Sequence, residues 1–247
     1  MSEIKEIPNK DFKVIAPKFI CDDPNNKIPE PFPKSHFNLL LVGRPGSGKS
    51  SLAVNLIAGK KRGSQVYRKQ FYNIYIICPE GSMKSLKKNP FKELDSECIY
   101  HEFNYENLLD IYNKISDNAE EEENSLLYLD DLAAELKNGG RALENIFKKL
   151  AYNRRHLRLS IINCIQRLTA LPKAIRAGVS DLIFFNLSKN ENKILYDEMI
   201  DIPLNRYITL CNHCFKTKHD NIYVKLDTLE FYRNFNKLEG VCDHIII

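Results

Sequence analysis

A segment of eight residues, GRPGSGKS at positions 43–50, constrains this chain more than any other feature of its sequence. Glycines at three of its positions allow backbone N–H groups to turn inward around an anion. A short apolar run precedes the segment at residues 37–42, and residues 50–58 predict a helix that ends at Gly59. This order of strand, loop and helix is what a phosphate-binding loop requires. A chance match in a glycine-containing turn is the alternative, and the flanking elements argue against it.

The loop residues predict specific contacts with Mg-ATP. We expect Lys49 to bridge the β- and γ-phosphates and the Ser50 hydroxyl to hold Mg²⁺. The residues expected to bind the nucleotide are Gly43, Arg44, Pro45, Gly46, Ser47, Gly48, Lys49, Ser50 and Ser51.

A second apolar run, at residues 125–129, ends in two carboxylates, Asp130 and Asp131. A phosphate-binding-loop enzyme needs one carboxylate for the Mg²⁺ shell and a second to orient or deprotonate the attacking water. We assign Asp130 to the metal and Asp131 to the water. Many such ATPases carry Glu at the second place, and Asp131 could instead cap the following helix.

Further apolar runs predict strands at residues 74–78, 159–165 and 182–185, and possible short strand character at 98–100. Helices are predicted at residues 143–150 and after Pro172. Strands that alternate with helices predict an α/β fold with a mainly parallel central sheet flanked by helices. The polar, lysine-rich residues 81–92 are expected to form a loop.

The ends of the chain differ from this pattern. Residues 1–36 are rich in proline and are expected to form an extended leader. Residues 37–247 are expected to form a single domain, with a core at 37–185 and a C-terminal extension at 186–247. In that extension, residues 206–211 and 222–226 look β-like and could pair as a hairpin at the sheet edge.

Three polar residues are further candidates for the site. Gln166 follows the strand at 159–165 and could reach the γ-phosphate or its attacking water, or it could satisfy loop backbone. Arg155 and Arg176 are candidates for a finger that stabilises the transition state in a neighbouring subunit. The alternatives for both arginines are a solvated surface position or a contact to a DNA phosphate.

Composition narrows the class of protein. The net charge of +4 is compatible with a polyanionic partner. Seven cysteines without a repeating spacing, and an N-terminus without an apolar signal region, indicate a reducing, intracellular compartment. No apolar run approaches the roughly 20 residues of a membrane-spanning helix. Cys211, His213 and Cys214, with His219 and the later Cys242 and His244, could form a zinc knuckle. Ordinary cysteines are favoured because Cys211 belongs to a strand pattern and no second pair has zinc-ribbon spacing.

The order of these motifs resembles the genome-packaging ATPases of large cytoplasmic DNA viruses and virophages, the poxvirus-type branch of the FtsK and HerA superfamily. The resemblance covers residues 37–185 and rests on GRPGSGKSS at 43–51, LLYLDDL at 126–132 and the stretch 150–185. That stretch contains Arg155-His156, Gln166, Leu171-Pro172, Ile175-Arg176 and Ser180.

The resemblance implies a RecA-like core that assembles as a ring of identical subunits and drives double-stranded DNA into a preformed capsid by ATP hydrolysis. It implies that Gln166 is the polar sensor, and it favours Arg155 over Arg176 as the arginine that acts in trans. It also implies capsid or portal vertex proteins as partners, and location at viral assembly sites in the host cytoplasm and in the virion.

Two alternatives remain open from the sequence. One is a HerA-like DNA helicase or translocase that is not tied to packaging. The other is a nucleotide-binding structural subunit that hydrolyses little ATP, which Asp131 in place of Glu would allow.

Overall fold

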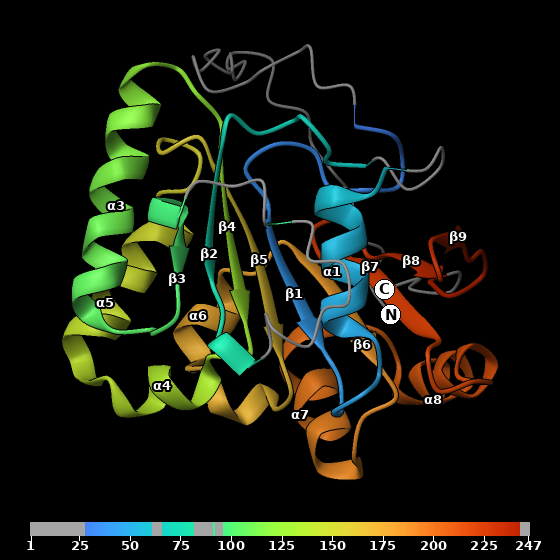
Figure 1. The fold of residues 1–247 in the computed structure, drawn as a ribbon. Coiled ribbons are helices and arrows are strands. Elements are labelled where there is room, and N and C mark those ends of the chain that lie inside the picture. The colour runs from blue at the N-terminus through green and yellow to red at the C-terminus, as the bar shows by residue number, and fades with distance from the viewer. Residues whose placement is uncertain (1–27, 61–65, 82–90, 92–95, 243–247) are drawn as a thin grey trace, which may run out of the picture.

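The computed structural model describes residues 28–60, 66–81, 91 and 96–242. Its centre is a nine-stranded sheet in the order β3-β2-β4-β5-β1-β6-β7-β8-β9 (Figure 1). The first six strands are β1 (Asn38–Val42), β2 (Asn73–Ile77), β3 (Ile99–Tyr100), β4 (Ser125–Asp130), β5 (Leu159–Ile165) and β6 (Asp181–Phe185). These six pair in parallel.

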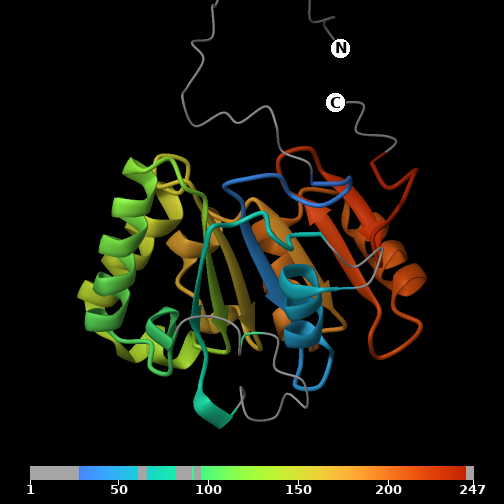
Figure 2. The same ribbon diagram turned by 45° about the horizontal axis from the view of Figure 1, so that its top comes forward.

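The sheet continues with three strands from the C-terminal extension, β7 (Asn221–Lys225), β8 (Glu230–Arg233) and β9 (Asn236–Lys237). Each of them is antiparallel to the strand before it in the sheet. In Figure 2 they lie at the opposite end of the sheet from β2 and β3. The predicted mixed α/β fold with a mainly parallel central sheet is confirmed.

Helices and 3₁₀ turns connect the strands. The helices are α1 (Lys49–Ala58), α3 (Tyr105–Glu120), α4 (Ala133–Asn138), α5 (Gly140–Tyr152), α6 (Lys173–Ala177), α7 (Lys189–Met199) and α8 (Leu204–Cys214), and the 3₁₀ turns are η2 (Ser96–Cys98) and η3 (Leu168–Ala170). No helix in the described ranges is both long and apolar enough to span a bilayer.

The core lies on both faces of the sheet, which explains the uninterrupted apolar runs of the central strands. Every residue of β1 is buried, and alternate residues point to opposite faces. Leu40 and Val42 join the cluster that includes apolar residues of α3, α5, α7 and α8. Leu39 and Leu41 join a second cluster, against α1. The parallel strands therefore cannot slide without moving apolar side chains out of both clusters.

The predicted strand at residues 206–211 is wrong, because these residues belong to α8. The local run of Tyr207, Ile208 and Thr209 has β-forming side chains. Tyr207, Leu210 and Cys214 are nevertheless the buried residues of the helix, with the i, i+3, i+7 spacing of one helical face. The strand predicted at 222–226 is confirmed as β7, and its hairpin partner is β8.

One helix was not predicted from the sequence, and two predicted segments lie largely outside the described residues. The helix α3 was not identified, although Leu108, Ile111 and Ile115 bury one face and Asn104 caps its first turn by accepting a hydrogen bond from Asn107 N at 2.9 Å. Almost all of the loop expected at residues 81–92, and residues 1–27 of the leader, lie outside the described part of the chain.

Candidate nucleotide site

The phosphate-binding loop lies at the carboxyl end of β1, between the carboxyl ends of β5 and β6. Its backbone turns through two left-handed glycines, Gly46 at φ 70° and Gly48 at φ 109°. Side chains other than glycine rarely adopt these angles, so the glycines allow the loop to curl. α1 begins directly after Gly48, and its first N–H groups therefore face the space inside the loop.

Lys49 closes this loop from inside. The residue is 7% exposed, and its Nζ donates hydrogen bonds to Gly43 O at 2.8 Å and Arg44 O at 3.3 Å. Burial lowers the pKa of its ammonium group, while the nearby carboxylates act in the opposite direction. The Lys49 ammonium group therefore lies inside the loop, where it can exchange the loop carbonyls for phosphate oxygens.

The two residues predicted to hold Mg²⁺ are in contact. Ser50 Oγ donates to Asp130 Oδ1 at 2.9 Å, and Asp130 lies at the end of β4 with 7% exposure. Burial raises the pKa of the Asp130 carboxyl, which the hydrogen bond from Ser50 opposes. A hydroxyl and a carboxylate at this distance are suitable oxygen ligands for Mg²⁺.

One further polar atom supports the fit to a phosphate group. Ser47 Oγ is buried in the loop and has no hydrogen-bond partner among the described atoms. Buried hydroxyls are normally paired, so a phosphate oxygen in the loop would supply the missing partner. The residues present therefore fit Mg-ATP.

The residues predicted to handle the attacking water are also in contact. Asp131 lies just after β4 in a left-handed conformation with φ 59°, and its N–H bonds to Cys164 O on β5 at 2.8 Å. Gln166 follows β5, and its Nε2 donates to Asp131 Oδ2. Burial raises the pKa of the Asp131 carboxyl. The N-cap of α4 is Leu132 and no side chain caps that helix, so Asp131 does not act as its cap.

The loop after Gln166 is held by a residue that sequence reasoning missed. Glu191, on α7, is 7% exposed and accepts hydrogen bonds from Leu168 N at 2.6 Å and Thr169 Oγ1 at 2.9 Å. Ser188 and Glu191 have the spacing of a helix-capping pair, which was the available signal. The Glu191 side chain instead fixes the segment that carries Gln166.

Arg176 contacts the same loop. Its Nη1 donates to Leu168 O at 2.9 Å, and its Nε and Nη2 donate to the two carboxylate oxygens of Glu198 at 2.8 and 3.0 Å. This bidentate pair is one-tenth exposed on the arginine side. Action in a neighbouring subunit would require these contacts to break, and this favours Arg155 for that role.

Arg155 lies far from the loop of its own chain. It precedes β5, whereas Gln166 follows β5, so the length of the seven-residue strand, roughly 20 Å, separates them. Arg155 is exposed and lines a pocket of about 320 Å³ together with Arg154, His36 and Asp181. The structure therefore brings together the predicted phosphate, metal and water residues of one chain, but not Arg155.

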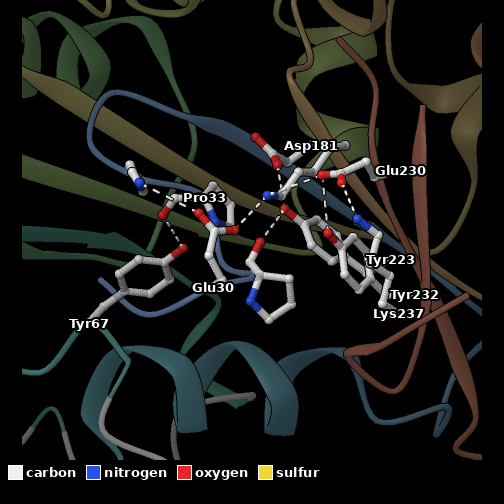
Figure 3. Close-up of polar contacts among 11 residues, drawn as sticks. Glu30, Pro33, Tyr67, Asp181, Tyr223, Glu230, Tyr232 and Lys237 are labelled. Carbon is white, nitrogen blue, oxygen red and sulfur yellow. Dashed lines mark hydrogen bonds and ion pairs between the residues drawn. The ribbon is translucent and has the colours of Figure 1, made fainter. Parts of the chain in front are cut away.

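On the side of the sheet opposite the loop, where Arg155 lies, a network of polar contacts joins residues of the leader to the sheet (Figure 3). The buried Asp181 Oδ1 lies 2.7 Å from the hydroxyl of Tyr223, which is also 3.1 Å from Pro31 O. Lys225 Nζ donates to Glu30 at 2.8 Å, and Arg154 Nε donates to His36 O at 2.8 Å. The described end of the leader, residues 28–36, is thereby attached to β6, to β7 and to the segment before β5.

The zinc alternative gains no support. Within the part of the chain that the structure describes, no group of three or more His, Cys, Asp or Glu side chains could hold a metal ion. Cys211 and Cys214 form no disulfide, and His219 Nδ1 lies 2.9 Å from Ser47 O of the loop. His244 lies outside the described residues.

The comparisons with known proteins agree with this arrangement. Residues 30–226 match the family described as poxvirus A32 protein. This chain belongs to the poxvirus A32 protein family. The resemblance inferred from the loop, the Asp pair and the stretch 150–185 is thereby confirmed, and the family match extends into the leader and the C-terminal extension. No curated protein matches the A32-family chain.

Solved structures share the fold at low sequence identity. B204, the DNA-packaging ATPase from Sulfolobus turreted icosahedral virus, aligns with a TM-score of 0.62 at 14% identity over 80% of this chain and 96% of B204. B204 from Sulfolobus turreted icosahedral virus 2, in complex with ATP-gammaS, aligns at 0.59 and 14% over 80% and 96%. EssC (ATPases 2 and 3) from Geobacillus thermodenitrificans aligns at 0.54 and 12% over 77% of this chain and 38% of EssC.

Proposed function

We propose that this A32-family protein hydrolyses Mg-ATP and uses the energy to move double-stranded DNA into a preformed viral capsid. The observation that carries the proposal is the meeting of three contacts at one edge of the sheet. Lys49 closes the loop, Ser50 bonds to Asp130, and Gln166 bonds to Asp131. Family membership and the B204 fold, which belongs to a protein named as a packaging ATPase, support the coupling to DNA.

Each contact corresponds to one requirement of phosphoryl transfer. Lys49 and the loop N–H groups hold the phosphates, while Ser50 and Asp130 would hold Mg²⁺, which neutralises charge on the β- and γ-phosphates. Asp131 orients the attacking water and accepts its proton, and its raised pKa makes it a better base than an ordinary carboxylate. Gln166 positions Asp131 through the hydrogen bond that they share.

The arginine that completes the site comes from a second copy in this proposal. Arg155 is exposed at the edge opposite the loop, and Arg176 is bound to Glu198 in its own chain. A ring of identical subunits would place the Arg155 edge of one copy against the loop edge of the next. An arginine supplied in this way stabilises the charge of the transition state.

The partners of this motor follow from the same proposal. Translocation of any sequence requires contacts to the DNA backbone rather than to base edges. The net charge of +4 fits contacts of this kind in local basic patches. Capsid or portal vertex proteins would receive the DNA at viral assembly sites in the host cytoplasm.

The proposal is tested by steady-state ATP hydrolysis with Mg²⁺, with and without linear double-stranded DNA of several sequences. We expect turnover that duplex DNA stimulates whatever its sequence, and that Lys49→Ala abolishes. Lys149→Ala is the matched control, because Lys149 is an exposed lysine of α5 outside the site. Stoichiometric ATP binding without turnover, with or without DNA, would instead identify a structural subunit.

A further inference from the structure

The turn before β7, residues 215–220, lies at the mouth of the phosphate-binding loop. β7 runs antiparallel to β6, with Asn221 paired to Phe185, so the segment that precedes β7 lies at the edge where β6 ends. That edge also carries the loop. His219 Nδ1 lies 2.9 Å from Ser47 O, and since a carbonyl oxygen only accepts, Nδ1 donates in this contact.

Lys218 lies beside Gly46 of the loop. A Cβ atom added at Gly46 would lie 3.1 Å from Lys218 Nζ and 3.7 Å from its Cε. The ammonium group is therefore close to the glycine at the turn of the loop, on the side open to solvent. It comes from the C-terminal extension, whereas Lys49 comes from the first turn of α1.

The turn that carries Lys218 is fixed by Asp220. This residue is 5% exposed, and its Oδ2 accepts hydrogen bonds from Lys216 N at 2.9 Å and Thr217 N at 2.6 Å. Its Oδ1 accepts from Asn234 Nδ2 at 2.8 Å. The backbone on both sides of Lys218 is therefore held against the protein, which lowers the entropy lost when its side chain binds a ligand.

The charge of Lys218 has no counter-ion in the described part of the chain. No salt bridge or hydrogen bond of its ammonium group is found among the described residues. Lys216 differs, because its Nζ donates to Asn212 O, in the last turn of α8, at 2.8 Å. An unpaired cation held beside Gly46 is therefore available to an anion that binds in the loop.

We propose that Lys218 is a second phosphate-binding lysine of this site, which contacts the polyphosphate chain of the nucleotide in the loop. The inference rests on the proposed ATP site and adds a residue from the C-terminal extension to it. His219 holds the turn against the loop, and Lys218 supplies the charge. The extension then belongs to the nucleotide site as well as to the sheet.

The test is the affinity of the full-length protein for a non-hydrolysable ATP analogue, measured by isothermal titration calorimetry. We expect Lys218→Met to weaken binding about 10-fold, because a charge-assisted contact to phosphate is lost. Lys218→Arg keeps the charge and is expected to retain most of the affinity. Lys216→Met is the matched control and should bind as the wild type does. The difference between wild type and Lys218→Met should shrink at high salt.

Two results would overturn the inference in distinguishable ways. If Lys218→Met binds the analogue as tightly as wild type, Lys218 does not contact phosphate and the ATP site itself stands. If folded wild type does not bind the analogue at all, the proposed function fails, and the role of Lys218 fails with it. Melting curves of all four proteins, expected to coincide, separate these results from misfolding.

Discussion

The sheet has two edges at the ends of its parallel strands, the loop edge and the opposite edge, and their polar side chains differ in their hydrogen-bond partners. At the loop edge, Lys49, Asp130 and Gln166 contact other members of the site, and a bound nucleotide would replace several of these contacts. At the opposite edge, Asp181 and Tyr223 hold the described end of the leader to β6 and β7. A bound nucleotide would therefore replace hydrogen bonds at the loop edge, whereas the hydrogen bonds at the opposite edge would remain. We refer to this opposite edge, with Asp181 and Tyr223, as the fastened edge.

This difference explains why Arg155 is placed where it is. An arginine that acts on a neighbouring subunit needs an exposed guanidinium group and a backbone that is held in place. Arg155 is exposed, while the adjacent Arg154 is bound to His36 O and Ala151 O. The hydrogen bonds of Arg154 therefore hold the backbone next to Arg155, while the Arg155 side chain stays exposed.

The largest expected effect at the fastened edge comes from Arg155→Ala. We expect turnover of the assembled protein to fall about 1,000-fold, because the transition-state charge loses its arginine. Nucleotide affinity should stay within about twofold, since Arg155 lies far from the loop of its own chain. Arg141→Ala, which removes an exposed arginine of α5, is the control and should turn over normally. Unchanged turnover in Arg155→Ala would remove this residue from the site.

A smaller effect is expected for the pair Asp131 and Gln166 at the loop edge. Asp131→Asn and Gln166→Ala should each lower kcat about 100-fold, because each removes one member of a unit that handles the water. The double variant should be little worse than Asp131→Asn alone. Effects that multiply in full would show that the two residues act independently, contrary to their contact in the structure.

At the fastened edge, Tyr223→Phe should affect stability and spare chemistry. Loss of the hydroxyl leaves the buried Asp181 with fewer partners and should lower the free energy of unfolding by about 2 kcal/mol. For a chain of this length the corresponding decrease in Tm is about 6 °C. Tyr72→Phe is the control, since Tyr72 is 75% exposed. A kcat per folded molecule that falls with Tyr223→Phe would contradict the division between the edges.

The smallest effect is expected from the turn that carries Lys218. Hydrogen bonds from Asn234 and from two backbone N–H groups hold the pKa of Asp220 well below the ordinary value of 3.8. Because the folded pKa is the lower one, this contribution to stability is present above pH 3.8 and is lost as the pH falls toward the folded value. Asp220→Asn should therefore melt about 4 °C below wild type at pH 7, and the gap should narrow by pH 3. A gap that does not change with pH would mean that the Asp220 charge contributes nothing.

The features that could be predicted from the sequence are those whose residues are contiguous in the chain. The loop at residues 43–50 and the Asp pair at 130–131 each follow directly from an apolar strand, so their position at one edge of a parallel sheet could be predicted. The spacing of α5 was equally local. The alternation of these elements was enough to predict the fold class.

Contacts between residues that are distant in the sequence could not be predicted. His219 contacts Ser47 across 172 positions, and no local pattern indicates that the turn at 215–220 returns to the loop. The error at 206–211 hid this return, since a strand there would have changed the path of the extension. Glu191 and Arg176 likewise support the Gln166 loop through tertiary contacts that spacing alone does not reveal.

The most direct test of the account is to mix two inactive variants, Lys49→Ala and Arg155→Ala, and to measure ATP turnover. If the loop edge of one copy is completed by Arg155 of the next, mixed assemblies contain some sites with both Lys49 and Arg155 intact. We predict that the mixture regains a substantial fraction of wild-type turnover while each variant alone stays inactive. A mixture as inactive as its components, under conditions where the two variants co-assemble, would contradict a site shared between the two edges.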